Sequence, residues 1–241
     1  MASHMSTRLP DQPRQRWQLL YARAAPALFL RQADLLAAFE HAFTAAGLPL
    51  SRSNAKRPRV RITFAASPPA GIALRAEVVE AYFDELVALE RIQAAAAQLP
   101  EGVTIVDARE VWHGFPSAAS QLRAAEYEVE VRGKSGLTSD ALRGAIVRLL
   151  ATETLPDRRR RGESERRVDV ASRDLRPLVE DVEVIEVNEA AHTARLRLVL
   201  RTDSSGAGRP EDVVRALDIP LSAGPTTRTR LLFVDTPPIA R

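Results

Sequence analysis

The sequence predicts an α+β protein made of two ferredoxin-like halves, each with the element order β-α-β-β-α-β. Three observations predict this class. Strand-like and helix-like hydrophobic spacings alternate along the chain, the same order of elements occurs twice, and the charge changes sign with a period of about half the chain. The predicted halves span residues 14–111 and 125–241, with a connector at 112–124. Residues 1–13 are expected to be a flexible N-terminus that starts with an expression-tag remnant, residues 1–5.

The first half begins with a strand and a helix. Apolar and polar residues alternate over 16–23, which favours a strand, and apolar residues recur at helical spacing from Leu35 to Ala46. Asp34 stands where a carboxylate suits a helix N-terminus, and Gly47 and Pro49 end the helix. The remaining elements are predicted as strands at 59–64 and 77–83, a helix at 86–99 and a strand at 103–111.

The second half repeats this order after the connector. A helix over 137–150 is expected to be capped by Thr138 or Ser139, and Asn188 marks the turn of a hairpin. The predicted elements are a strand at 126–131, the helix, a strand within 155–170, the hairpin strands 182–187 and 194–200, a helix at 210–217 and a closing strand at 227–234.

Composition excludes several classes of function. The 241-residue chain is 45% hydrophobic, which is ordinary for a globular protein, and its lack of cysteine excludes disulfides, cysteine-ligated zinc, iron–sulfur clusters and thiol catalysis within this chain. No apolar run is long enough to span a membrane and the N-terminus lacks a secretory signal, so a cytoplasmic protein without a membrane partner is expected. His41, His113 and His192 lack metal-ligand spacing, and no cofactor is expected to bind this chain.

Charge is unevenly distributed although the net charge is only +3. Residues 8–61 carry a net charge of +7 and 62–133 of −6, whereas 134–176 carry +4 and 177–241 carry −2. Lys56 and Lys134 are the only lysines among 34 basic residues. A GC-rich genome explains the preference for arginine but not its clustering, and guanidinium groups suit phosphate recognition.

Two basic segments are the candidate RNA-binding sites. The first lies in a loop that leads into a strand, and its alternative interpretation is a solvated loop. The second is a run of arginines, for which a protein partner or a solvated loop are the alternatives. The candidate residues are Arg52, Lys56, Arg57, Arg59 and Arg61 in the first segment, and Arg158, Arg159, Arg160, Arg161, Arg166 and Arg167 in the second.

Aromatic residues make up only 5% of the chain. Recognition of phosphates and shape is therefore expected rather than stacking on single-stranded bases. The connector sequence from Trp112 to Phe115 is expected to pack between the halves, with ligand stacking as the alternative.

Short motifs along the chain carry a resemblance to one bacterial family. They include Phe29-Leu30, Asp34-Leu35, Gly47-Leu48-Pro49, the arginine-rich stretch before Val168, and Thr229-Arg230-Leu231-Leu232. On these motifs the chain resembles the radical-SAM-linked family of uncharacterised bacterial proteins. The family's Ser-His pair is Arg31-Gln32 here, so a site that needs this histidine is absent. The resemblance implies association with a radical SAM protein.

The sequence therefore predicts an RNA-binding accessory module, for tRNA or rRNA, without catalytic activity of its own. Its implied partner is a radical SAM enzyme on a separate chain, which would carry the cluster because this chain has no cysteine. One alternative is a metal-independent RNA-modifying enzyme that uses Asp34 as nucleophile or base. Another is an adaptor that binds only protein.

Overall fold

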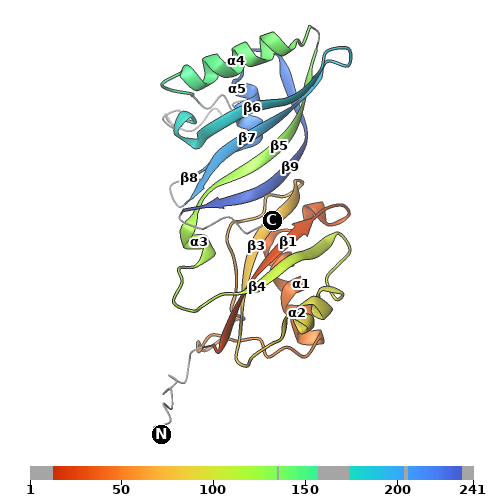
Figure 1. Cartoon of the computed structure of the whole chain (residues 1–241), viewed down its shortest axis with the longest axis vertical. Coiled ribbons are helices and arrows are strands. Elements are labelled where there is room, and N and C mark those ends of the chain that lie inside the picture. The colour runs from red at the N-terminus through yellow and green to blue at the C-terminus, as the bar shows by residue number, and fades with distance from the viewer. Residues whose placement is uncertain (1–12, 135, 157–173, 204–205, 235–241) are drawn as a thin grey trace, which may run out of the picture. The chain divides into compact units, whose positions relative to one another are not determined.

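The computed structural model describes residues 13–134, 136–156, 174–203 and 206–234, and it combines a mostly antiparallel sheet with helices (Figure 1). Contacts divide the chain into two compact units. Unit 1 comprises residues up to 71 together with 76–121, and unit 2 comprises residues 72–75 together with those from 122 onward. In the described part of the chain, no helix has the length and apolarity needed to cross a membrane.

Each unit contains four main strands and two main helices. In unit 1 these are β1 (Gln15–Arg23), α1 (Gln32–Ala45), β2 (Ile62–Phe64), β3 (Ala73–Phe83), α2 (Leu89–Ala96) and β4 (Val103–Glu110), followed by the short α3 (Ala118–Gln121). In unit 2 they are β5 (Leu122–Gly133), α4 (Ser139–Ala151), β6 (Val179–Asn188), β7 (Thr193–Asp203), α5 (Pro210–Ala216) and β9 (Leu221–Phe233), with the two-residue β8 (Gly206–Ala207).

The strands of unit 1 lie in the order β4-β1-β3-β2, with antiparallel pairs β1–β4 and β2–β3. One face of this sheet is covered by α1, because period-2 alternation sends Tyr21 of β1 and Phe83 of β3 to the same side as the helix. Tyr21 meets Phe39 edge-on at 5.5 Å between ring centroids, and Phe43 meets Phe83 at 5.7 Å. The opposite face carries the polar side chains that build the candidate site.

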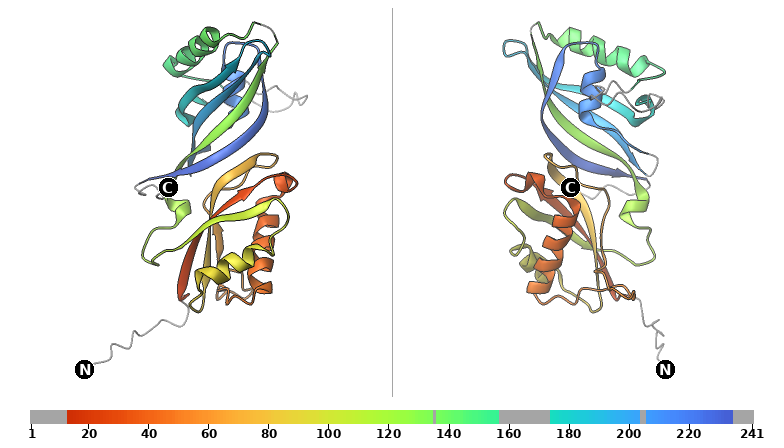
Figure 2. Two further views of the ribbon diagram at one scale, coloured as in Figure 1. Left: turned by 45° about the vertical axis from the view of Figure 1, so that its right-hand side comes forward. Right: turned by 180° about the vertical axis from the view of Figure 1, so that it is seen from behind.

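The strands of unit 2 lie in the order β9-β5-β7-β6, all paired antiparallel. At the β9 edge the first residues of β3, Ala73 and Leu74, pair in parallel with β9. Helix α4 contacts β6, and α5 contacts β9 and β5; Figure 2 shows the two helices from further sides. In both units the fourth, first, third and second main strands therefore lie in that order.

Several element boundaries differ from the sequence predictions. The strand expected at 59–64 is regular only over β2, and the helix expected at 86–99 is limited to α2 because Ala88 has an extended backbone. Strands β5 and β9 start earlier than predicted. The strand expected within 155–170 lies mostly outside the described residues. Next to that gap, Pro156 and Asp174 form an isolated antiparallel bridge. The hairpin of β6 and β7 and the cap at Thr138 are confirmed.

Candidate nucleic-acid interface

The basic loop, residues 51–61, lies between α1 and β2 in unit 1 and is closed by its own hydrogen bonds. The Ser53 N–H donates to the Arg59 carbonyl at 2.8 Å, and Ser53 Oγ accepts from the Arg59 N–H at 3.0 Å. Arg52 and Val60 form an antiparallel bridge beside these bonds. The tip, residues 54–57, is therefore a bend closed by these bonds, and Lys56 and Arg57 lie in it.

Three cations of the basic loop are available to an external anion. Lys56, Arg57 and Arg59 are exposed, and none of them makes an ion pair among the residues that the structure describes. Arg52 pairs with Glu40 at 2.7 Å, with both side chains partly exposed. Exposed pairs contribute only about 0–1 kcal/mol, so a phosphate can compete with Glu40 for Arg52.

Arg61 differs from the other cations of the basic loop. The sequence predicts that Arg61 shares a solvent-facing strand face with Arg59, but Arg61 is only partly exposed and precedes the regular strand. Its backbone is fixed, because its N–H donates to the Ser51 carbonyl at 2.8 Å and its carbonyl accepts from the Tyr82 N–H at 3.1 Å. Arg61 therefore belongs to the base of the loop, and it is less exposed than the other cations of the loop.

The base of the loop is attached to the end of β3 at Tyr82. The Ser51 N–H donates to the Tyr82 carbonyl at 2.8 Å, opposite the bond from Tyr82 to Arg61. Burial and the nearby Glu80 carboxylate raise the pKa of Tyr82 above its ordinary value, although the charges of Arg16 and Arg61 oppose this.

A buried ion pair anchors the connector to the polar face of the unit 1 sheet. Arg16 of β1 and Glu80 of β3 lie 2.5 Å apart with side chains 3% and 1% exposed. Arg16 also donates to the carbonyls of Phe115 (2.7 Å) and Pro116 (2.9 Å), while Glu80 accepts from the Ala118 N–H at 3.1 Å. Arg16 thus binds backbone carbonyls of the connector and Glu80 binds a backbone N–H, so the ion pair fixes residues 115–118 on the sheet.

The aromatic residues of the connector are exposed rather than packed. Trp112 is 70% exposed and Phe115 is 60% exposed, with ring centroids 5.8 Å apart in an edge-to-face arrangement. Within unit 1 the two rings contact one another and are otherwise exposed, and the expectation that they pack between the halves stays a prediction. The backbone of the segment is anchored through its carbonyl groups instead, which leaves the rings free to face solvent.

The residues considered for catalysis or metal binding have structural or exposed positions. Asp34 is exposed in the first turn of α1, and its carboxylate accepts the Arg31 N–H at 2.8 Å as a helix cap. His41 and His113 are exposed and His192 lies in a turn with φ 53°. Over the described ranges, no group of three His, Cys, Asp or Glu side chains is placed to hold a metal ion.

The second basic segment cannot be placed beside the first. All six of its candidate residues fall within 157–173, outside the described residues. Their RNA contacts stay a prediction.

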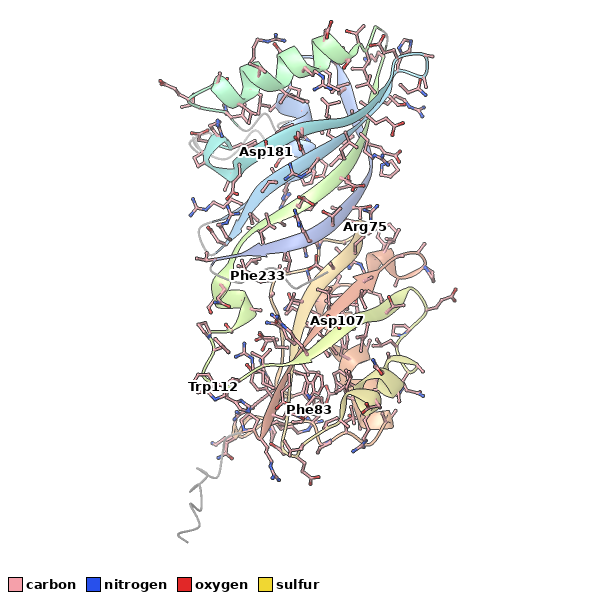
Figure 3. All side chains as sticks on the ribbon, viewed as in Figure 1. Arg75, Phe83, Asp107, Trp112, Asp181 and Phe233 are labelled. Atoms are coloured by element: carbon pink, nitrogen blue, oxygen red, sulfur yellow. The ribbon has the colours of Figure 1, made fainter. Side chains whose placement is uncertain are left out.

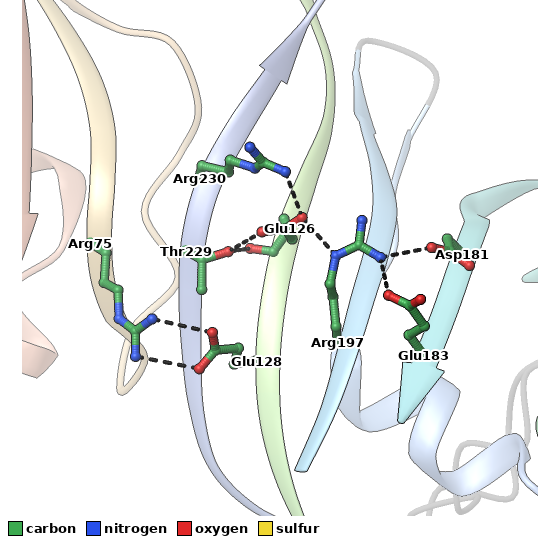
Figure 4. Close-up of polar contacts among 8 residues, drawn as sticks. All are labelled: Arg75, Glu126, Glu128, Asp181, Glu183, Arg197, Thr229 and Arg230. Carbon is green, nitrogen blue, oxygen red and sulfur yellow. Dashed lines mark hydrogen bonds and ion pairs between the residues drawn. The ribbon is translucent and has the colours of Figure 1, made fainter. Parts of the chain in front are cut away.

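Unit 2 carries a network of paired charges that the sequence analysis missed (Figure 4). Glu126 of β5 accepts from Arg197 at 2.9 Å, from Arg230 at 3.0 Å and from Thr229 Oγ1 at 2.9 Å. Arg197 reaches further to Asp181 at 2.8 Å and to Glu183 at 2.9 Å. These arginines are neutralised by neighbouring strands, in contrast to those of the basic loop.

The strand register explains this network. Glu126 stands opposite Arg230 in the β5–β9 pair, and Glu183 stands opposite Arg197 in the β6–β7 pair, so acidic and basic side chains face one another across neighbouring strands. The alternating Glu-x-Glu-x-Glu of β5 and Arg-x-Arg of β7 are visible in the sequence. These patterns show which glutamate pairs with which arginine only when the register of the strands is known.

Acidification is expected to lower the free energy of unfolding through protonation of Glu126 in unit 2. Burial alone raises the pKa of this carboxyl, but hydrogen bonds from Arg197, Arg230 and Thr229 outweigh it and hold the pKa below the ordinary value. A lowered folded-state pKa stabilises the protein above the unfolded-state pKa of about 4.3, and this contribution is lost as pH falls through the folded-state value. Urea unfolding of wild type and Glu126→Gln between pH 7 and pH 3 measures the effect.

The Glu126→Gln variant should be less stable than wild type at pH 7, with the difference shrinking below about pH 4. Asp218→Asn is the matched control, because Asp218 pairs with Arg148 at a more exposed position and should show a smaller effect. A stability difference that stays constant from pH 7 to pH 3 would contradict the role assigned to Glu126.

Comparison with known proteins places the chain in a family. The sequence pattern of a family described as "Uncharacterized protein conserved in bacteria (DUF2344)" matches residues 16–210. The chain belongs to this family. The basic loop, the connector and strands β5 to β7 all lie within the part of the chain that matches DUF2344. No curated protein matches the chain.

Solved structures include distant likenesses to this DUF2344 chain. One is a chain of a Cbf5-Nop10-Gar1 complex, 10% identical with a TM-score of 0.49, where the match covers 90% of this chain and 50% of the other. Another is a chain of an H/ACA RNP bound to a substrate RNA containing 2'-deoxyuridine, 9% identical with a TM-score of 0.48, covering 90% and 49%. This chain thus spans about half the length of those chains.

Proposed function

We propose that the chain is a cytoplasmic RNA-binding accessory module that contacts the phosphates of a structured RNA, with tRNA or rRNA as the target class. The observation that carries the proposal is the basic loop, where Lys56, Arg57 and Arg59 are exposed and unpaired within the described residues. Phosphate contacts by such cations dominate affinity for nucleic acids. The contrast with the neutralised arginines of unit 2 supports a ligand for this loop in particular.

The repeated strand order supports a tandem of two ferredoxin-like units as the scaffold of this module. In the second unit the arginine run from Arg158 to Arg161 is proposed as an additional phosphate contact. A radical SAM enzyme on a separate chain is the proposed partner, which rests on the family resemblance. Affinity capture of the tagged chain with mass spectrometry tests it, and absence of any radical SAM protein among the captured chains would refute it.

Neutralising the basic loop is expected to weaken RNA binding by about 100-fold at ~0.1 M salt. The variant Lys56→Gln/Arg57→Gln/Arg59→Gln removes three cations that make no ion pair among the described residues. The slope of log affinity against log salt should fall by about 0.7–0.9 for each phosphate that is no longer neutralised, or roughly 2 in total. Fluorescence anisotropy with bulk tRNA at several salt concentrations measures both quantities.

The matched control is Arg123→Gln/Arg148→Gln/Arg195→Gln. These three arginines are also exposed, and each is already paired with a carboxylate in unit 2. The control changes the net charge by the same amount as the loop variant. If the basic loop has a specific role, the control should lose much less RNA affinity than the loop variant. Equal losses in both variants would mean that RNA responds to overall charge alone, and unchanged binding in the loop variant would refute the proposal.

A further inference from the structure

Four aromatic side chains form two neighbouring ring pairs in unit 1, Trp112 with Phe115 and His113 with Tyr82, and the base of the basic loop is bonded to Tyr82. The turn from Trp112 to Phe115, called the aromatic turn below, is closed by the Phe115 N–H donating to the Trp112 carbonyl at 3.1 Å. Within it, the His113 ring lies 6.4 Å from the ring of Tyr82 between centroids, with an interplanar angle of 32°. Figure 3 shows Trp112 at the same end of unit 1 as Phe83, the last residue of β3.

The aromatic turn is held in place although its rings are exposed. A Cβ on Gly114 would lie 2.1 Å from Cη2 and Cζ3 of the Trp112 indole, so this ring lies directly over the glycine. The Phe115 carbonyl is fixed by the buried Arg16, whose guanidinium also lies 5.7 Å from the Tyr82 ring centroid. Exposed rings on a fixed backbone cost little ordering entropy when a flat ligand stacks on them.

Tyr82 connects the aromatic turn with the basic loop. Its backbone bonds to Ser51 and Arg61 at the base of the loop, and its ring contacts His113 of the turn. Cations that follow a phosphate backbone and aromatic rings that stack on successive bases are the combination that single-stranded nucleic acids require. The sequence does not indicate this arrangement, because aromatic residues are few overall and the rings come from two segments that are distant in sequence.

We propose that the aromatic turn, together with Tyr82, is a stacking surface for unpaired RNA bases whose phosphates lie along the basic loop. The inference rests on the proposed RNA-binding function and adds its substrate class, which is single-stranded or loop RNA rather than duplex. The cations of the basic loop, whose base is bonded to Tyr82, favour this occupant over an apolar protein segment, because such a segment would leave three cations without counter-charge.

Trp112→Ala is expected to weaken binding of a 12-nucleotide oligouridylate by about 5- to 100-fold, the range for removal of one stacked base. Binding of a 12-base-pair RNA duplex should change by less than about 2-fold, because its bases are already stacked inside. The salt slope should stay at the wild-type value, because the variant keeps every cation that neutralises a phosphate. Fluorescence anisotropy at several salt concentrations gives all three quantities.

Two further variants separate stacking from general surface change. Gly114→Ala keeps the indole but forces it off the glycine, and it should also weaken oligouridylate binding. Phe29→Ala is the matched control, because Phe29 is an exposed aromatic of unit 1, 75% exposed, outside the aromatic turn, and it should bind like wild type. In wild type, oligouridylate should quench the fluorescence of exposed Trp112, whereas Trp17 is buried.

The outcomes distinguish this inference from the proposed function. Weaker oligouridylate binding in Trp112→Ala with an unchanged salt slope supports the stacking surface. Equal wild-type affinity for oligouridylate and duplex, with no effect of Trp112→Ala, overturns the stacking surface and leaves phosphate binding intact. If Trp112→Ala no longer captures a protein partner but still binds oligouridylate like wild type, the aromatic turn binds that protein, and the proposed stacking surface is overturned. Absence of any RNA binding by wild type refutes both proposals.

Discussion

Replacing Glu80 with alanine is expected to lower the free energy of unfolding by about 3–5 kcal/mol, because it leaves the buried Arg16 charge uncompensated. Glu80 is 1% exposed and one of its oxygens accepts from Arg16, Gln18 and the Ala118 N–H. Losing this carboxylate removes the counter-charge and three hydrogen bonds together. Urea unfolding at pH 7 measures the effect.

The double variant Arg16→Met/Glu80→Leu separates charge from packing. Apolar replacement of a buried ion pair is often neutral or stabilising, so most of the stability lost in Glu80→Ala should return. The carbonyls of Phe115 and Pro116 nonetheless lose the Arg16 donor, so the double variant should bind oligouridylate more weakly than wild type. A cost below about 1 kcal/mol for Glu80→Ala would show that the pair does not anchor the connector.

Replacing Phe39 with alanine is expected to cost about 3–5 kcal/mol through the cavity that it leaves. Phe39 is fully buried on α1 and its ring meets those of Tyr21, Phe43 and Phe64 at 5.5–6.1 Å. Phe39→Leu keeps most of the volume and should cost clearly less. Thermal or urea unfolding compares the two, and an equal, small cost for both would contradict the central place of Phe39 in the core of unit 1.

Much of the fold could be predicted from the sequence, because alternation and helical spacing reflect burial directly. Ile62 and Phe64 are buried and Thr63 is exposed, as the alternation requires, and the buried face of α1 includes Leu35, Phe39 and Phe43. Element ends were less predictable. Alanine-rich sequence favours helix over 86–99, but the extended backbone of Ala88 delays the start and α2 has only eight residues.

Only the basic loop of the candidate site could be predicted from the sequence. The basic loop stands out as a cluster of cations, but partners distant in sequence decide which cations are free. Arg16 and Glu80 are separated by 64 residues, and no local pattern shows that both are buried. The expectation that Trp112 and Phe115 pack away follows from their apolar character. In the structure the connector is anchored in unit 1 by polar bonds of its backbone, a feature that their apolar character does not indicate.

Ultraviolet crosslinking of bound RNA to the full chain, followed by mass spectrometry of the crosslinked peptides, tests RNA binding at this end of unit 1 most directly. A mixed population of tRNA and rRNA fragments carrying 4-thiouridine is the probe, at a salt concentration of about 0.1 M. We predict crosslinks in the basic loop, residues 51–61, and in the aromatic turn, residues 112–115. Crosslinks confined to other segments, or none above the level of the loop-neutralised variant, would contradict it.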